Sequence, residues 1–168
     1  MFYNMFFKIL VASILLLAIF GLIGYFARDD SDYFRERIIN EINSKCQIGE
    51  TCEINMDTFI DSEWNKMVIY FSDVSDASIS EALGVEYKSS GVFKNGIIFA
   101  NDTEIVFEDY AVYNPDNPEK FDYFVENSGD FKNYSVFTRS NAVLIGKKQQ
   151  MQGYIRYVLC TPTSMIQE

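Results

Sequence analysis

The chain has 168 residues, of which 48% are hydrophobic and 16% aromatic, and its formal net charge at pH 7 is −10. This length allows one ordinary domain plus a short accessory segment, and the apolar content argues against a disordered chain. Lys8 is the only charged side chain before Arg28, so the remaining chain has 13 Lys and Arg against 24 Asp and Glu, a net charge of −11. Such acidity disfavours binding to nucleic acid or anionic lipid and favours a cationic protein partner, although it can also serve solubility alone.

An uncharged apolar run begins at Ile9 and ends at Ala27. As a helix it would be about 28 Å long, close to the ~30 Å hydrocarbon core of a bilayer. A signal peptide cut after Ala27 would need a small residue at −3, where this chain has the bulky Tyr25. The run therefore predicts an uncleaved signal-anchor helix over residues 9–27, within a membrane anchor of residues 1–27. A cleaved signal and a buried core helix are the alternatives.

The orientation of this anchor depends on more than the flanking charges. Lys8 and the N-terminal amine precede the helix, and Arg28, Arg35 and Arg37 follow it, so the positive-inside rule is nearly balanced. The short tail before the apolar run and a cysteine pair that suits an oxidising compartment both favour an external domain. We expect a single-pass protein of the bacterial cytoplasmic membrane with its C-terminal domain outside the cytoplasm, in the periplasm.

Two cysteines, Cys46 and Cys52, are separated by five residues that include Gly49. A turn at this glycine would bring the two Cβ atoms within bonding reach, so the spacing predicts a disulfide, with unpaired structural cysteines as the alternative. Zinc is a poor alternative, because the spacing is long and the chain has no histidine. Cys160 lies in an apolar run and is expected to be a buried hydrophobic residue.

The residues between the anchor and the cysteines predict a helical stalk over residues 28–45. Phe34, Ile38 and Ile42 recur every four residues and form one apolar stripe. The remaining residues, 46–168, form the predicted external domain. No internal repeat or second domain boundary is evident.

The order of predicted elements in residues 46–168 is one strand, a short helix and then several strands. Ser78 and Glu81 have the spacing of a capping box, and Gly84 supplies a C-cap, which together predict the helix. Strands are predicted at residues 65–71, 96–100, 103–113, 134–138, 142–145 and 154–160, with a hairpin turn at Asn101-Asp102, a turn at residues 146–150 and a surface excursion from residue 114 to about 130. This order predicts an α+β fold with a mainly antiparallel sheet and one or two helices on one face.

The chemistry open to this chain is limited by its lack of histidine. Ser-His-acid and Cys-His nucleophilic sites and most transition-metal sites need an imidazole, and no phosphate-binding or dinucleotide motif is present. Glu108-Asp109, or Asp57 with Asp61, could serve a two-carboxylate hydrolase. However, neighbours on a strand point to opposite faces, and 24 acids make such pairs inevitable. No cofactor, metal site or catalytic residue is predicted.

Aromatic side chains are the other abundant resource of this chain. Some could line a binding groove, as aromatic residues do at interface centres, but the core is the simpler location for them. Trp64, the only tryptophan, is expected to be a core anchor. The candidate groove residues are Phe121, Tyr123, Phe124, Phe131, Tyr134 and Phe137.

Residues 59–84 resemble a loosely defined group of small bacterial envelope proteins of unknown function. In that group a Trp-Asp pair opens a strand that ends in Phe-x-Pro-Tyr, and a short helix ending in Leu-Gly follows. Here Trp64 is followed by Asn65 instead of aspartate, and Phe71-Ser72-Asp73 departs from the Pro-Tyr ending. The resemblance implies a membrane-tethered, non-enzymatic domain and transfers no catalytic residue.

These observations favour an extracytoplasmic protein-binding domain held in the lipid bilayer by its N-terminal helix. An immunity protein against a toxin, or an envelope accessory factor, would fit. The alternatives are a small carboxylate-dependent envelope hydrolase and a purely structural tether.

Overall fold

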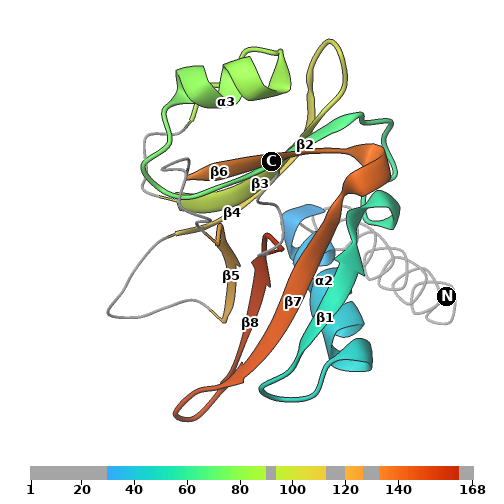
Figure 1. Ribbon diagram of the computed structural model, residues 1–168, viewed down its shortest axis with the longest axis vertical. Helices are drawn as coiled ribbons and strands as arrows, with labels where there is room; N and C mark the ends of the chain where they lie inside the picture. The colour runs from blue at the N-terminus through green and yellow to red at the C-terminus, as the bar shows by residue number, and fades with distance from the viewer. Residues whose placement is uncertain (1–29, 90–93, 113–119, 127–132, 163–168) are drawn as a thin grey trace, which may run out of the picture. The chain divides into compact units, whose positions relative to one another are not determined.

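The computed structural model describes residues 30–89, 94–112, 120–126 and 133–162, and residues from Phe34 onward form one compact unit (Figure 1). The predicted anchor, residues 9–27, lies outside the described residues. Among the described helices, none has the length and apolar character that a bilayer crossing requires.

The described elements confirm an α+β fold, with two α-helices, two short 3₁₀ turns and eight strands. In chain order they are α2 (Asp30–Lys45), β1 (Thr51–Asn55), η1 (Met56–Thr58), β2 (Lys66–Tyr70), α3 (Asp76–Leu83), β3 (Lys94–Ala100), β4 (Ile105–Val112), β5 (Phe121–Phe124), β6 (Tyr134–Thr138), η2 (Arg139–Asn141), β7 (Val143–Gln150) and β8 (Ile155–Cys160).

The strands form two four-stranded sheets, where the sequence predicts one. Sheet A has the order β1-β7-β8-β5, and sheet B has the order β4-β3-β2-β6. All neighbours are antiparallel except β5 and β8, which are parallel. The prediction of mainly antiparallel pairing is confirmed.

The main hydrophobic core lies between the two sheets and α2. Phe34, Ile38 and Ile42 of α2 are fully or almost fully buried there, together with Ile54 of β1 and Leu144 of β7. The stripe predicted for a stalk is therefore packed into the domain. Behind the strands β1 and β7 in Figure 1, α2 covers one face of sheet A.

The opposite face of sheet B forms a second, smaller core with α3. Alternate residues of β2 and β3 enter it, including Val68, Tyr70 and Ile98, and they pack against Ile79 and Leu83 of α3. Because the two central strands of sheet B are apolar on both faces, each face needs a cover. The two helices therefore pack against faces of different sheets, whereas the sequence predicts the helices on one face of a single sheet.

The helix α3 begins earlier than the sequence predicts. Its N-cap is Ser75, whose side chain accepts a hydrogen bond from the Ser78 amide, so the predicted start at Ser78 is wrong by a turn. The predicted end is confirmed: Gly84 is the C-cap with φ +80°, a conformation that favours glycine. The early start places Asp76 in the first turn of the helix, beside β2.

The strand β7 continues through residues that the sequence predicts to form a turn. Gly146, the first of these, pairs with Cys52 on β1 and Leu159 on β8. A Cβ at Gly146 would lie 2.7 Å from Cγ1 of Ile42, so the glycine permits α2 to cross closely over the sheet. Its role is close packing, and the chain reverses only after Gln150.

The two cysteines predicted to pair are brought together at the end of α2. Their Cα atoms are 5.6 Å apart and their sulfur atoms are at bonding distance, which fits the predicted disulfide. Gly49 turns the intervening loop with φ +84°. The link ties the C-terminus of α2 to the edge strand β1.

Candidate functional site

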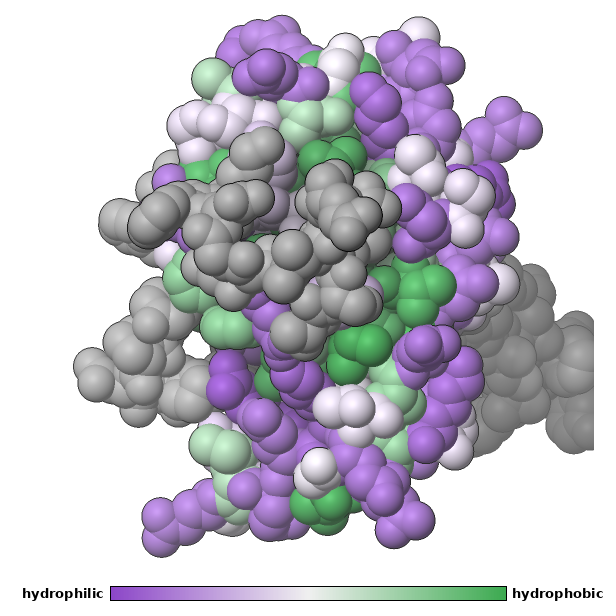
Figure 2. All heavy atoms as spheres, viewed as in Figure 1, coloured by the Kyte–Doolittle hydropathy of each residue, from purple (hydrophilic) through white to green (hydrophobic). Residues whose placement is uncertain are grey.

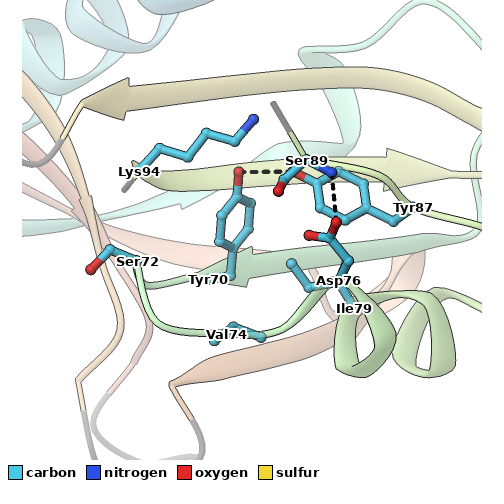
Figure 3. Close-up of a pocket in the computed structure, with 8 residues that line it drawn as sticks. All are labelled: Tyr70, Ser72, Val74, Asp76, Ile79, Tyr87, Ser89 and Lys94. Carbon is cyan, nitrogen blue, oxygen red and sulfur yellow. Dashed lines mark hydrogen bonds between the residues drawn. The ribbon is translucent and has the colours of Figure 1, made fainter. Parts of the chain in front are cut away.

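A small polar pocket lies between the end of β2, the start of α3, the segment after α3 and the start of β3 (Figure 3). Its volume is about 40 Å³, which is room for a few water molecules and no more. The lining residues are Tyr70, Ser72, Val74, Asp76, Ile79, Tyr87, Ser89 and Lys94.

Three polar side chains of the pocket wall donate hydrogen bonds to the same carboxylate oxygen. Oε1 of Glu108 on β4 accepts hydrogen bonds from Nζ of Lys94 at 2.7 Å, from the Tyr87 hydroxyl at 2.8 Å and from the Tyr70 hydroxyl at 3.3 Å. The Lys94 ammonium also lies 4.0 Å from the ring centroid of Tyr110, at cation–π distance. Lys94 is only 4% exposed, and this ring of partners compensates its charge.

Both tyrosines of this network are held neutral. Burial raises the pKa of Tyr70 well above its usual value, and its hydrogen bond with Tyr87 and the nearby Glu108 raise it further. Burial also raises the pKa of Tyr87, and its hydrogen bond with Tyr70 offsets only part of this. The two hydroxyls are therefore hydrogen-bond donors and not bases at neutral pH.

The far side of the pocket is formed by Asp76 at the start of α3. Its Oδ2 accepts a hydrogen bond from the Ser89 amide at 3.0 Å (Figure 3). The charge of Lys94 is neutralised by Glu108. These hydrogen bonds join β2, β3 and β4 to the segment after α3, so the polar groups of the pocket hold this side of sheet B together.

The two neighbouring carboxylates singled out on β4 are not brought together. Glu108 points to the α3 side of sheet B, and Asp109 points into the main core, where it is 2% exposed. Arg35 pairs with Asp109 at 2.8 Å, and the Tyr123 hydroxyl also donates to it. Glu108 and Asp109 therefore do not face one substrate. Of the other predicted pair, Asp57 forms an ion pair with Arg139, and Asp61 is exposed.

Most of the aromatic candidates belong to the core. Trp64 is 3% exposed and packs edge-on against Phe99, as predicted for a core anchor. Phe121, Tyr123 and Phe137 are buried, Tyr134 is half-buried, and Phe131 lies outside the described residues. Phe124 is exposed and contacts Phe71. The described members of this set are therefore divided between the core and the surface.

A set of exposed acids lies at one end of sheet B. Asp61 and Glu63 are in the loop before β2, and Asp102 and Glu104 are in the hairpin turn between β3 and β4. The Asn65 amide donates to Ala100 O, and the Asn65 side chain donates to Asp102, so loop and hairpin are adjacent. We call Asp61, Glu63, Asp102 and Glu104 the acidic end. The sequence contains these acids, but no local signal groups them.

Most of the basic residues in the described part of the chain have polar partners within the domain. In the described part of the chain, seven of them form ion pairs with acids, whereas Asp61, Glu63 and Glu104 have no ion pair or side-chain hydrogen bond there. Arg37 and Lys66 donate to backbone carbonyls. The exposed charge that remains is therefore mainly negative, and Figure 2 shows hydrophilic residues over much of the face in view.

Within the described residues, no group of three or more acids and cysteines has the geometry of a metal site. Comparison with protein-family models, curated proteins and solved structures finds no match to this chain.

Proposed function

We propose that this protein is a membrane-anchored protein-binding domain whose partner is cationic. Residues 9–27 would cross the bacterial cytoplasmic membrane, and the domain would stand outside the cytoplasm. An immunity protein that neutralises a basic toxin at the membrane is the form of this function that we favour, with an envelope accessory factor as the alternative.

The observation that supports the proposal most directly is the acidic end. Its carboxylates are exposed and concentrated at one end of sheet B, while most of the described basic residues are paired with other groups of the domain. Complementary charges steer association and set specificity, so a basic surface would be attracted to this end. The resemblance of residues 59–84 to small envelope proteins is consistent with a tethered, non-enzymatic role.

The apolar run supports the anchor, and the cysteine pair supports the external location, because disulfides persist in oxidising compartments. Deleting residues 1–27 is expected to move the chain from the membrane fraction to the soluble fraction. Orientation is read from thiol labelling in intact cells after reduction with a membrane-impermeant reductant. Protection of Cys46 and Cys52 from an impermeant label would place the domain inside.

Partner binding can be tested by photo-crosslinking of the full-length chain in its membrane. A photoreactive residue replaces the exposed Ser62, between Asp61 and Glu63, and adducts are identified by mass spectrometry. We expect one discrete adduct with a basic protein. Three charge reversals, Asp61→Lys, Glu63→Lys and Glu104→Lys, should weaken it at least tenfold, since each rim charge contributes roughly 0.5–1 kcal/mol.

The matched control reverses three other exposed acids, Glu50→Lys, Glu53→Lys and Glu81→Lys, and so changes the net charge equally. This variant should keep the adduct. An adduct that survives the first set of reversals, or that both sets remove equally, would contradict binding at the acidic end.

A further inference from the structure

The sheets of this domain end in four edge strands, and the hydrogen-bond pattern shows which residues point outward on each. In an antiparallel pair, the peptide groups of every second residue bond to the neighbouring strand and those between point away. An exposed edge with free N–H and C=O groups is a template for another strand. The edges are β1 and β5 in sheet A and β4 and β6 in sheet B.

Two of these edges each have one outward carbonyl that accepts a hydrogen bond from a basic side chain of α2. On β1, the hydrogen bond from Met56 N to Ala142 O shows that the peptide groups of Glu53 point outward. Lys45 donates to the Glu53 carbonyl at 3.3 Å. On β4, the peptide groups of Tyr110 point outward, and the guanidinium of Arg35 donates to the Tyr110 carbonyl. A basic side chain therefore lies against each of these two edges.

The edge of β5 is protected in another way. Lys120 O accepts a hydrogen bond from Tyr157 N of β8, and Phe124 O accepts one from Thr161 N, just after β8. The peptide groups of Phe121 and Tyr123 therefore point away from β8. Both side chains are buried, and the Tyr123 amide donates to Oδ1 of Asp122. The strand β5 also lies against strands of sheet B.

On β6, in the described part of the chain, no basic side chain donates to an outward carbonyl. Phe71 N bonds to Asn133 O, and Arg139 N bonds to Asn65 O, so the peptide groups of Tyr134, Val136 and Thr138 point away from β2. The Thr138 amide is capped by Asn141 Oδ1. Within the described part of the chain, the outward peptide groups of Tyr134 and Val136 have no hydrogen-bond partner, and the Val136 side chain is 42% exposed.

The sequence of β6 carries none of the usual protections of an exposed edge. Tyr-Ser-Val-Phe-Thr has no charge and no proline, and it is rich in residues that favour strands. We propose that β6 is the docking edge of the partner, which adds an extended segment of its own chain to sheet B. This inference rests on the proposed protein-binding function and states how the partner is held.

The charges around β6 define the chemistry of that segment. At its N-terminal end, Asn133 holds the exposed carboxylate of Asp73 with a side-chain hydrogen bond. At its C-terminal end lie two cations that are already occupied: Arg139 pairs with Asp57, and Lys66 donates to the Leu83 carbonyl. The loop directly before Lys66 carries Asp61 and Glu63, which are exposed. Five residues of strand span about 17 Å. The segment that fits has a β-branched centre of about five residues and a Lys or Arg at each end.

A second copy of this chain is a poorer occupant. Two domains that each carry a net charge of −11 repel one another, and the acids at both ends of β6 would meet the same acids of the other copy. A basic segment meets the opposite charge at both ends. Main-chain hydrogen bonds would supply affinity, and the flanking charges would supply selectivity.

The test uses hydrogen exchange of individual amides in the full-length chain in detergent micelles. The probes are two synthetic peptides, Lys-Thr-Val-Thr-Val-Thr-Lys and Glu-Thr-Val-Thr-Val-Thr-Glu. The amides of Tyr134 and Val136 are expected to exchange rapidly in the free chain. Saturating lysine-flanked peptide should slow them at least tenfold, and the glutamate-flanked peptide should leave them unchanged.

Two variants connect the protection to the edge. Val136→Pro removes an outward N–H without breaking a bond to β2, so it should lower the affinity for the lysine-flanked peptide at least tenfold. Val136→Thr keeps both the N–H and the branched shape and should bind as the wild type does. Unchanged exchange of the Ile69 amide in Val136→Pro, together with an unchanged melting temperature, shows that sheet B is intact.

The proposal is overturned if both peptides protect equally or neither does. It is also overturned if the two amides are protected in the free chain. In that case, protection that grows with chain concentration identifies a second copy as the occupant, and protection independent of concentration identifies the chain itself. If charge reversal removes the Ser62 adduct but neither peptide protects the two amides, the partner binds at the acidic end and β6 is not its docking edge.

Discussion

Nε of Arg35 in α2 lies 2.8 Å from Oδ2 of Asp109 in β4, and this ion pair joins two elements that are 74 residues apart in sequence. The Asp109 side chain is 2% exposed and also accepts from the Tyr123 hydroxyl, so three elements meet at one carboxylate. A helix that sequence alone describes as a stalk is thereby fixed to both sheets.

Asp109→Asn should lower the free energy of unfolding by about 2–4 kcal/mol, because it leaves the guanidinium of Arg35 without its counter-charge in a largely buried place. Chemical denaturation monitored by circular dichroism measures this. The matched control is Asp57→Asn, which removes the partner of Arg139 in an ion pair whose members are more than 40% exposed. That change should cost less than about 1 kcal/mol. Equal effects of the two variants would contradict a special role for the buried pair.

The disulfide between Cys46 and Cys52 should stabilise the domain by about 2 kcal/mol, because it closes a loop of seven residues in the unfolded chain. Replacing both cysteines with serine, or reducing the protein, should lower the melting temperature by several degrees. Reduction of the double variant serves as the control and should change nothing. A double variant with the wild-type melting temperature would show that the disulfide does not stabilise the domain.

Cys160 should be unreactive in the folded protein. Its thiol is buried, donates to Ile145 O at 3.3 Å, and has a pKa that burial raises to about 11. At pH 8 about one thiol in a thousand would be the reactive thiolate. Iodoacetamide should therefore leave the native, unreduced chain unlabelled and modify one thiol per chain in guanidinium chloride. Full labelling of the native chain would show that this part of β8 opens readily.

Three buried tyrosines make the domain sensitive to alkali. The pKa values of Tyr70, Tyr87 and Tyr123 are raised in the folded state, chiefly by burial. The unfolded chain therefore loses these protons first, so stability that is complete below pH 10 falls as the pH rises above it. Denaturation at a series of pH values should show this decline. Absorbance at 295 nm should show these phenols ionising only as the domain unfolds.

A tyrosine of the buried network provides the control for that titration. Replacing Tyr87 with phenylalanine should remove absorbance from the part of the titration that accompanies unfolding, because burial raises the pKa of Tyr87 in the folded state. If all tyrosines ionised together near pH 10 without unfolding, the buried network around Glu108 would be wrong.

Several elements follow from local patterns in the sequence. The four-residue spacing of Phe34, Ile38 and Ile42 identifies α2, and the runs around Asn101-Asp102 identify the β3–β4 hairpin. The cysteine spacing identifies the pair that the structure brings together. These features depend on residues close in sequence, where helix and turn geometry fixes the distances.

The division into two sheets, the crossing of α2 at Gly146 and the strand β5 do not follow from such patterns. A glycine followed by two lysines and two glutamines has turn composition, and only the contact with Ile42 shows why it lies inside a strand. Nor does a list of acids show that Asp61 and Glu104 share one end of a sheet while Glu108 and Asp109 face opposite sides.

By itself, therefore, the sequence determined the composition of this protein, its acidity, its α+β class and the absence of imidazole chemistry. Only the tertiary structure decided which charges are paired inside the domain, which remain exposed at its surface, and in which direction the peptide groups of each edge strand point. The physical reason is that charge pairing and edge exposure depend on contacts between residues tens of positions apart, such as Arg35 with Asp109. Such contacts form only when the sheets and α2 are assembled.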